Sequence, residues 1–330
     1  MIDVVGLSKR YHSVQAVDRL TFGVDRGEIV GFLGPNGAGK TTTMRMLTTF
    51  LTATSGRATL AGFDVLDAPL EVRRHVGYLP EGVPLYPEMR VREYLNFRAL
   101  IKDIPRRQRA AAIDRVLERC QLVDVERRVL GHLSKGYRQR VGLAEAMVHD
   151  PDILILDEPT SGLDPIQIRE VRALIRELGD RHTILLSTHI MSEVEAVCTR
   201  VVMVVAGRIA LDQPLDRLQS RNVVLIEARG ASQAISHAVQ GVAGVVGVAA
   251  RPLGGDWYEF EVTVDGDSDL REPLAQRIAA GGWGLRLLDL GRSSLEDRFV
   301  RAVQEASLRR VVEPTDDPLS ATETASAGAA

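Results

Sequence analysis

The segment Gly34-Pro35-Asn36-Gly37-Ala38-Gly39-Lys40-Thr41, followed by Thr42, decides the fold. It fits Gly-x-x-x-x-Gly-Lys-Thr and stands where that pattern holds phosphate, between an expected strand (28–33) and an expected helix (40–51). Glycines let backbone N–H groups close around phosphates, and the helix N-terminus adds its positive dipole end. Lys40 is expected to reach the β- and γ-phosphates, and the Thr41 hydroxyl to ligate Mg²⁺. The segment therefore predicts a nucleoside triphosphate site.

Alternating strand and helix patterns surround this loop and indicate an α/β fold with a mostly parallel sheet over residues 1–216. The apolar runs 153–156 and 183–186 are expected to be strands buried on both faces. Between them, apolar spacing predicts a helix, with Asp164 as its N-cap and Pro165 as its first residue. An arginine-rich helical stretch predicts a helical insertion at about 88–148.

The C-terminal third is expected to form a second, smaller unit at 221–305, after a boundary near 217–222. Its pattern reads strand, helix, two strands, helix, strand and helix, which suggests an α+β module of the ferredoxin-like kind. A capping box beginning at Ser293 or Ser294 predicts the start of the last helix. The polar, Ala/Ser/Thr-rich stretch 311–330 is expected to be a disordered tail.

Composition limits the partners and the kinds of segment that we expect in this chain. The chain has 330 residues and a formal net charge of −3, which gives no electrostatic reason to expect nucleic acid. Its two cysteines, Cys120 and Cys198, match no metal or redox spacing. We expect no signal peptide and no transmembrane segment, because the N-terminus lacks a basic and apolar leader and the apolar runs are short.

A pair of acids follows the apolar run 153–156 and supplies the second half of the site. Asp157 is expected beside Mg²⁺ and Glu158 beside the attacking water, where a general base typically contributes about 10²–10⁴ in rate. Adjacent acids at a strand end are common by themselves. Downstream of a complete phosphate loop, they predict hydrolysis of the nucleotide.

The segment Leu133-Ser134-Lys135-Gly136-Tyr137-Arg138-Gln139-Arg140 reads as the start of a helix with Ser134 as its N-cap. Here the chain resembles the ABC ATPase family, whose signature has the form Leu-Ser-Gly-Gly-Gln. The match is partial, and Ser134 and Gly136 are kept. The resemblance covers residues 1 to about 215. It implies an ABC cassette, with a RecA-like core, a helical subdomain and N-terminal antiparallel strands.

Further residues take roles from this resemblance. Tyr11 matches the aromatic residue that stacks on adenine, and the segment Ser161-Gly162-Leu163-Asp164 is similar to the D-loop that couples two nucleotide sites. His189 resembles the switch histidine that contacts the γ-phosphate. The resemblance implies that two copies close head to tail around ATP, so that Ser134 and Gly136 of one copy face the phosphate loop of the other.

The family pattern is not kept everywhere. The family usually has Gln after the strand that corresponds to 76–80, touching Mg²⁺ or water, and this chain has Glu81 there. A carboxylate can still reach the metal, so Glu81 is a candidate ligand.

A looser resemblance, carried by Ser294-Leu295-Glu296-Asp297-Arg298-Phe299 and by the form of the signature, is to ATPase subunits of ABC-2-type exporters, including gliding-motility and drug-resistance members. It implies a separately encoded permease and a peripheral position on the cytoplasmic face of the membrane. The C-terminal module could contact a second copy or the permease, sense a ligand, or brace the fold.

Two other functions stay open at this point. One is an ABC ATPase acting in translation or DNA maintenance, although the chain has one cassette and no sustained heptads. The other is a P-loop small-molecule kinase, which the signature helix disfavours. Guanine specificity is unsupported, because none of Lys9, Lys40, Lys102 and Lys135 stands in an Asn/Thr-Lys-x-Asp context.

Overall fold

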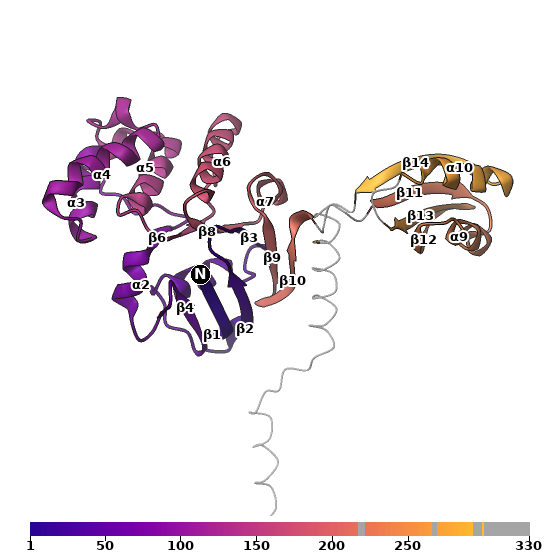
Figure 1. The fold of residues 1–330 in the computed structure, drawn as a ribbon, viewed down its shortest axis with the longest axis horizontal. Coiled ribbons are helices and arrows are strands. Elements are labelled where there is room, and N and C mark those ends of the chain that lie inside the picture. Colours follow the sequence, from indigo (N-terminus) through magenta and orange to yellow (C-terminus); the bar gives the residue numbers. More distant parts are fainter. Residues whose placement is uncertain (217–221, 266–268, 293–298, 300–330) are drawn as a thin grey trace, which may run out of the picture.

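The computed structural model describes residues 1–216, 222–265, 269–292 and 299 (Figure 1). Its centre is a six-stranded sheet in the order β10-β9-β3-β8-β7-β6. The neighbours among β6 to β9 and β3 run parallel, and β10 is antiparallel to β9. Their bounds are β3 (Ile29–Leu33), β6 (Val76–Leu79), β7 (Ile153–Asp157), β8 (Thr183–Thr188), β9 (Arg200–Val205) and β10 (Arg208–Pro214). The predicted α/β fold with a mostly parallel sheet is confirmed.

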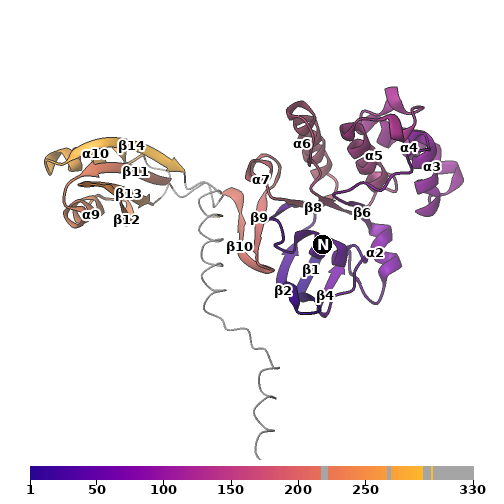
Figure 2. The ribbon, with the colours of Figure 1, turned by 180° about the vertical axis from the view of Figure 1, so that it is seen from behind.

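Three strands of this sheet, β3, β7 and β8, are buried along their whole length. Their sequences are apolar on both faces because helices cover one face, and the helix after the phosphate loop covers the other together with a second sheet. That second sheet is antiparallel between its neighbours and has the order β2-β1-β4-β5 (Figure 2). It consists of β1 (Ile2–Tyr11), β2 (Val14–Val24), β4 (Ser55–Leu60) and β5 (Phe63–Asp64).

The helix after the phosphate loop is shorter than the sequence suggests. We expected it over 40–51, and α1 is Lys40–Leu47. The Thr48 hydroxyl donates back to the Met44 carbonyl at 2.8 Å, and Thr49 has φ +63°, a left-handed conformation that ends an α-helix. The apolar residues Phe50 and Leu51 continue the helical spacing in the sequence, but they lie in a turn beyond the helix. Their N–H groups donate to the Arg45 carbonyl at 2.9 and 3.1 Å.

Other helices begin where side-chain caps place them. The N-cap Asp164 accepts from the N–H groups of Ile166 and Gln167, both at 3.0 Å, at the start of α6 (Pro165–Gly179). Ser134 accepts from the N–H of Tyr137 at 3.4 Å at the start of α5 (Lys135–Met147). Both predicted caps are confirmed. Two shorter helices, α2 (Pro69–His75) and α7 (Met191–Val197), accompany β6 and β9.

A helical subdomain stands beside the β6 edge of the sheet (Figure 1). It comprises α3 (Val91–Ile101), α4 (Arg106–Arg119) and α5, with 3₁₀ turns at Val123–Val125 and Leu130–His132. Its interior continues the apolar core beneath β7 and β8 through residues such as Leu95, Val116 and Leu143. A helical subdomain is therefore confirmed, and its bounds of 88–148 stay a prediction.

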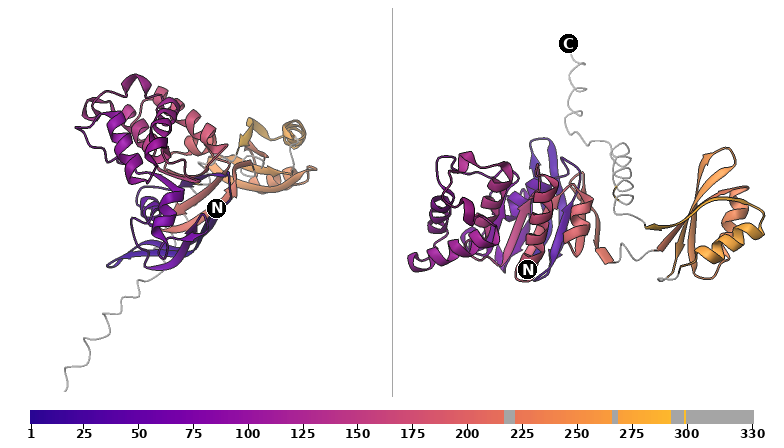
Figure 3. Two further views of the ribbon diagram at one scale, coloured as in Figure 1. Left: turned by 60° about the vertical axis from the view of Figure 1, so that its left-hand side comes forward. Right: turned by 90° about the horizontal axis from the view of Figure 1, so that it is seen from above.

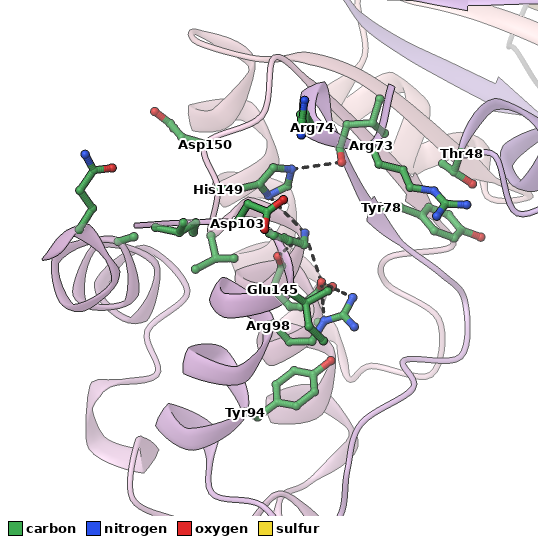
Figure 4. Close-up of a pocket in the computed structure, with 18 of the residues that line it drawn as sticks. Thr48, Arg73, Arg74, Tyr78, Tyr94, Arg98, Asp103, Glu145, His149 and Asp150 are labelled. Atoms are coloured by element: carbon green, nitrogen blue, oxygen red, sulfur yellow. Dashed lines mark hydrogen bonds and ion pairs between the residues drawn. The ribbon is translucent and has the colours of Figure 1, made fainter. Parts of the chain in front are cut away.

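A polar network ties this subdomain to the sheet (Figure 4). The Glu145 carboxylate accepts from Arg98 at 2.7 and 2.9 Å and pairs with Lys102 at 3.2 Å. Burial, helped by the nearby Lys102 ammonium, lowers the pKa of His149 to about 3. The neutral ring can therefore accept from Lys102 at 3.2 Å through Nδ1 and donate to the Val76 carbonyl at 3.2 Å through Nε2. The network joins α3 and α5 to the start of β6.

A third sheet, in the order β12-β13-β11-β14, lies in the C-terminal part (Figure 3). Its elements follow as β11 (Asn222–Arg229), α9 (Ser232–Gln240), β12 (Val245–Gly254), β13 (Trp257–Val264), α10 (Arg271–Ala280) and β14 (Gly284–Arg292). Both helices pack on one face of the sheet in a single core around Phe260. The ferredoxin-like module is confirmed. The predicted helix start at Ser293 or Ser294 and the tail 311–330 lie outside the described residues.

Candidate nucleotide site

The phosphate loop connects β3 to α1 and is shaped by its glycines. Gly37 and Gly39 have φ +78° and +100°, values that favour glycine. A Cβ on Gly39 would lie 2.5 Å from the Ala16 carbonyl oxygen, and one on Gly34 would lie 2.3 Å from that of Val204. Neither position can take a side chain without moving backbone. The loop therefore allows the close backbone approach that phosphate binding requires.

The Lys40 ammonium sits inside this loop and is only 6% exposed. It donates to the Gly34 carbonyl at 2.8 Å and to the Pro35 carbonyl at 3.3 Å, and lies 3.6 Å from Glu158 Oε1. A buried ammonium is held by such oxygens because its charge is costly without partners. Phosphate oxygens are stronger partners of the same kind, so the contacts can be exchanged when a nucleotide enters.

Asp157 and Thr41 provide oxygens suited to Mg²⁺. The Asp157 Oδ1 atom accepts from the hydroxyls of Ser187 and, at 3.4 Å, of Thr41, whereas its Oδ2 atom is buried without a hydrogen-bond partner. Burial raises the pKa of Asp157, which a cation would reverse. Hard oxygen ligands with one open carboxylate oxygen fit Mg²⁺, which also binds through waters and phosphates. The described residues contain no group of three His, Cys, Asp or Glu side chains around a metal position.

Glu158 and His189 meet at the ends of β7 and β8. The His189 Nδ1 atom lies 3.0 Å from both carboxylate oxygens of Glu158. Glu158 has φ +50°, unusual for a side chain with a Cβ, and its N–H donates to the Ser187 carbonyl at 3.1 Å. This backbone turns the carboxylate from the sheet toward Lys40. The structure thus brings together Lys40, Thr41, Asp157, Glu158 and His189, as the sequence predicted.

The signature residues belong to a different neighbourhood. Ser134 caps α5, and Gly136 is buried against Gln167 of α6, where a Cβ would lie 2.4 Å from the Gln167 Oε1 atom. The carboxylate of Asp164 is engaged as the N-cap of α6. Within the described part of the chain, no hydrogen bond or ion pair joins these three residues to the phosphate loop.

Tyr11 lies at the end of β1 and is 43% exposed. The Lys9 ammonium sits 5.3 Å from the centre of its ring while donating to the Thr52 carbonyl at 2.7 Å. An exposed, electron-rich ring of this kind can stack on a flat base. Its role as the adenine contact stays a prediction.

Glu81 follows β6 and is exposed. Burial raises the pKa of Asp157, and the negative charge of Glu81 adds to this rise, against the lowering effect of the hydrogen bonds from Ser187 and Thr41. Glu81 therefore lies within electrostatic reach of the metal position. Among the described residues around β6, no hydrogen bond or ion pair involves the Glu81 side chain. A carboxylate there is free to turn toward a cation.

Replacing Glu81 with Gln removes this charge and keeps the shape. We expect unchanged ATP binding and a higher Mg²⁺ concentration for half-maximal hydrolysis, because a carboxylate attracts the cation more strongly than an amide does. A Mg²⁺ titration of ATP hydrolysis measures the shift. Glu88→Gln, a similar change at an exposed residue of the same connection, serves as the control. Superimposable titrations for Glu81→Gln and wild type would remove Glu81 from the metal site.

Two residues near the site are not predicted from the sequence, Ser187 and Glu193. Ser187 donates to Asp157, although the sequence indicates a role only for His189 in Ser187-Thr188-His189. Glu193 is buried and accepts hydroxyl hydrogens from Thr160 and Thr188. An acid four residues after His189 on a short helix is the only sequence signal for it.

A cavity of about 1160 Å³ lies between the sheet and the helical subdomain rather than over the phosphate loop (Figure 4). Phe50, Leu70 and Ile101 line it with exposures of 71%, 66% and 52%, which shows that large apolar side chains face solvent there. The arginines at its rim are Arg73, Arg74 and Arg107, which are exposed, and Arg115, which is half-buried. They stand against two exposed acids, Asp103 and Asp150. We call this cavity the arginine-rimmed groove.

Known proteins share both the sequence and the fold. The sequence model of the family described as "ABC transporter" matches residues 17–161. A bacitracin transport ATP-binding protein, BcrA of Bacillus licheniformis, is 35% identical over 311 residues, 92% of this chain and 97% of the relative. A daunorubicin resistance ATP-binding protein, DrrA3 of Streptomyces coeruleorubidus, is 35% identical over 91% of this chain and 92% of its own length.

Solved structures agree with these relatives. An ATP-binding subunit of an ABC transporter superimposes with a TM-score of 0.61 at 31% identity, covering 66% of this chain and 92% of that one. The dimeric cassette MJ0796 gives a TM-score of 0.61 at 22% identity, over 65% and 99%. The latter likeness concerns the fold alone.

Proposed function

This chain belongs to the ABC transporter ATP-binding family, and from that premise we propose that its own residues bind Mg·ATP and hydrolyse it to ADP and phosphate. As the ATP-binding subunit of a transporter, it needs a site that does both. The carrying observation is the convergence of Lys40, the open Asp157 carboxylate oxygen, Glu158 and His189 at the ends of β7 and β8. ATP hydrolysis by the purified chain, followed as phosphate release, tests the proposal.

The geometry supports the following task for each side chain. The loop N–H groups and Lys40 hold the phosphates, while Thr41 and Asp157 would hold Mg²⁺, which supplies charge neutralisation when bound. Glu158, freed from Lys40, accepts a proton from the attacking water. His189, at 3.0 Å, keeps the carboxylate oriented and can donate toward the γ-phosphate once ATP is bound.

We propose further that two copies complete each site, head to tail. Within the part of the chain that the structure describes, neither Ser134 nor Gly136 bonds to the phosphate loop of its own copy. Ser134 is exposed at the N-terminus of α5, and Gly136 is buried against α6. A capped helix N-terminus is a suitable partner for the phosphates of another copy. Release of phosphate would separate the copies, so that ATP binding and hydrolysis drive a cycle of closing and opening.

The partner across the membrane is proposed to be a separate permease, of the ABC-2 type, working in export. No helix among the described residues is long and apolar enough to cross a bilayer. The relatives named for bacitracin transport and daunorubicin resistance favour transport over an ABC ATPase role in translation or DNA maintenance. The chain would then lie at the membrane surface on the side where ATP is present.

We place the permease contact in the arginine-rimmed groove. Its exposed Phe50, Leu70 and Ile101 favour a partner with apolar side chains. The groove has more arginine than aspartate at its rim, which favours acidic side chains on the same partner. The occupant would be a short permease helix with apolar and acidic side chains. Because α5 lines the groove and has Ser134 as its N-cap, a helix seated there contacts the same element that would face the second ATP.

A matched pair of leucines tests this contact. Leu70 and Leu66 are equally exposed, at 66%, but only Leu70 lines the groove. Leu70→Glu should lower recovery of the permease in a mild-detergent pull-down from membranes at least about tenfold, as expected when an interface anchor is replaced by a repelling charge. Leu66→Glu should leave recovery unchanged. Equal recovery with both variants would contradict the assignment, and both should hydrolyse ATP at the wild-type basal rate.

The division of the chain also stays a proposal. We propose a cassette at 1–216, with its helical insertion at 88–148, and an accessory module at 221–305. For the accessory module we favour contact with a second copy or with the permease.

A further inference from the structure

Glu193, in the first turn of α7, is a buried acid that none of the proposed phosphate or Mg²⁺ contacts uses. It is 1% exposed. Its Oε1 atom accepts the hydroxyl hydrogen of Thr160, and its Oε2 atom accepts that of Thr188 at 2.7 Å. Arg172 is the nearest cation, with Nη2 at 3.9 Å from Oε1. The carboxylate thus receives hydrogen bonds from two segments that are separate in sequence.

These two segments carry the residues expected to act on the attacking water. Thr160 lies two residues after Glu158, and Thr188 lies immediately before His189. The Thr188 carbonyl also accepts from the Gly34 N–H at 3.3 Å, at the start of the phosphate loop. On the exposed side, Glu158 and His189 touch at 3.0 Å. Glu193 joins the same two segments from the buried side.

Stability alone does not account for this arrangement. Glu145, another buried glutamate, pairs with Arg98 at 2.7 Å and Lys102 at 3.2 Å. Glu193 has one guanidinium nitrogen, beyond hydrogen-bond distance. A buried carboxylate with little compensating charge costs free energy, whereas an apolar side chain of similar size would not. What the carboxylate adds is two directional hydrogen bonds, which connect the Thr160 segment and the Thr188 segment through one side chain.

We propose that Glu193 is a positioning residue that sets the spacing between the Glu158 segment and the His189 segment. The proposal rests on the proposed ATPase function and adds a residue to it. Glu193 touches neither nucleotide nor water, and acts through Thr160 and Thr188. Loosening it leaves the phosphate loop and Mg²⁺ ligands in place, so ATP still binds. It lets Glu158 and His189 drift apart, and a misplacement of about 1 Å can cost up to about 10² in rate.

The test compares two threonine-to-valine changes in buried positions. Thr160→Val removes the hydroxyl that donates to Glu193. Thr183→Val removes a hydroxyl that accepts from the Gly27 N–H at 3.0 Å, at the opposite end of β8 from Thr188. Each change deletes one hydrogen bond of a nearly isosteric side chain, so both should lower the melting temperature by a few degrees, Thr160→Val more than Thr183→Val because its lost bond is to a charged group. Only Thr160→Val should lower kcat, by about tenfold or more, with KM for ATP within about threefold of wild type.

A second pair of variants, Glu193→Gln and Glu193→Ala, distinguishes the effect of the two hydrogen bonds from the effect of the negative charge. Glu193→Gln can still accept from one threonine and donate to the other, because a hydroxyl oxygen also accepts. It should keep most of the wild-type kcat, whereas Glu193→Ala should fall at least as far as Thr160→Val. The proposal is overturned if Thr160→Val loses no more kcat than Thr183→Val, or if Glu193→Gln is as slow as Glu193→Ala. A wild-type chain without ATPase activity would instead overturn the proposed function, and this proposal with it.

Discussion

Glu158→Gln is expected to lower kcat by about 10²–10⁴ and to hold the protein with ATP as a dimer. Gln has nearly the same shape as Glu, so the contacts near Lys40 at 3.6 Å and His189 at 3.0 Å can be kept by the amide oxygen. The lost property is the ability to accept a proton from water. ATP therefore stays unhydrolysed between two copies, and the closed state accumulates.

Size-exclusion chromatography with light scattering, with and without Mg·ATP, measures the dimer, and phosphate release measures kcat. Glu126→Gln is the control, since Glu126 pairs with Arg92 at 2.6 Å in the helical subdomain and should hydrolyse ATP at the wild-type rate. A Glu158→Gln protein that stays strictly monomeric with ATP would count against the head-to-tail scheme. One that hydrolyses ATP normally would remove Glu158 as the base.

How much of the site could be read from the sequence depended on whether its parts are contiguous. The phosphate loop is one continuous segment, so its motif is visible in the sequence. Its backbone geometry requires glycine at 34, 37 and 39, and the spacing of these glycines predicts that geometry. Asp157 and Glu158 follow a run of four buried apolar residues, so their place at a strand end was predictable. Buried parallel strands then bring Glu158 and His189 together, because β7 and β8 are neighbours whose carboxyl ends meet.

Features that depend on packing between segments could not be predicted. Apolar spacing ran past Leu47, and only the left-handed Thr49 and the hydroxyl of Thr48 show where α1 ends. Glu193 joins Thr160 and Thr188 across the chain, and its one sequence signal, an acid four residues after His189, fits a solvated helix residue equally well. The arginine-rimmed groove likewise arises from elements that meet only in the folded chain, α2, α3 and α5 among them.

Lys40→Met should remove ATP binding itself, which distinguishes it from Glu158→Gln. The Lys40 ammonium is 6% exposed and bonds to the Gly34 carbonyl at 2.8 Å, so it occupies a position that no other described cation shares in the loop. Met keeps the length and apolar stem of the side chain and removes the charge that pairs with phosphate oxygens, where charge-assisted bonds are strongest. We expect at least about a 100-fold loss of affinity, since each 1.4 kcal/mol is a factor of ten, each such bond contributes about 1.5–3 kcal/mol, and Lys40 is expected to bond to both the β- and the γ-phosphate.

Thermal unfolding measures this difference without relying on hydrolysis. Ligand at about 100 times its Kd stabilises a protein by about 2.7 kcal/mol, so Mg·ATP should raise the melting temperature of wild type and Glu158→Gln by several degrees. Lys40→Met should show no such rise at the same concentration, while its nucleotide-free melting temperature stays within a few degrees of wild type, because His189 still contacts Glu158. An undiminished rise would mean that the loop N–H groups hold the phosphates without Lys40. The present assignment of the ammonium would then be wrong, even if hydrolysis were lost.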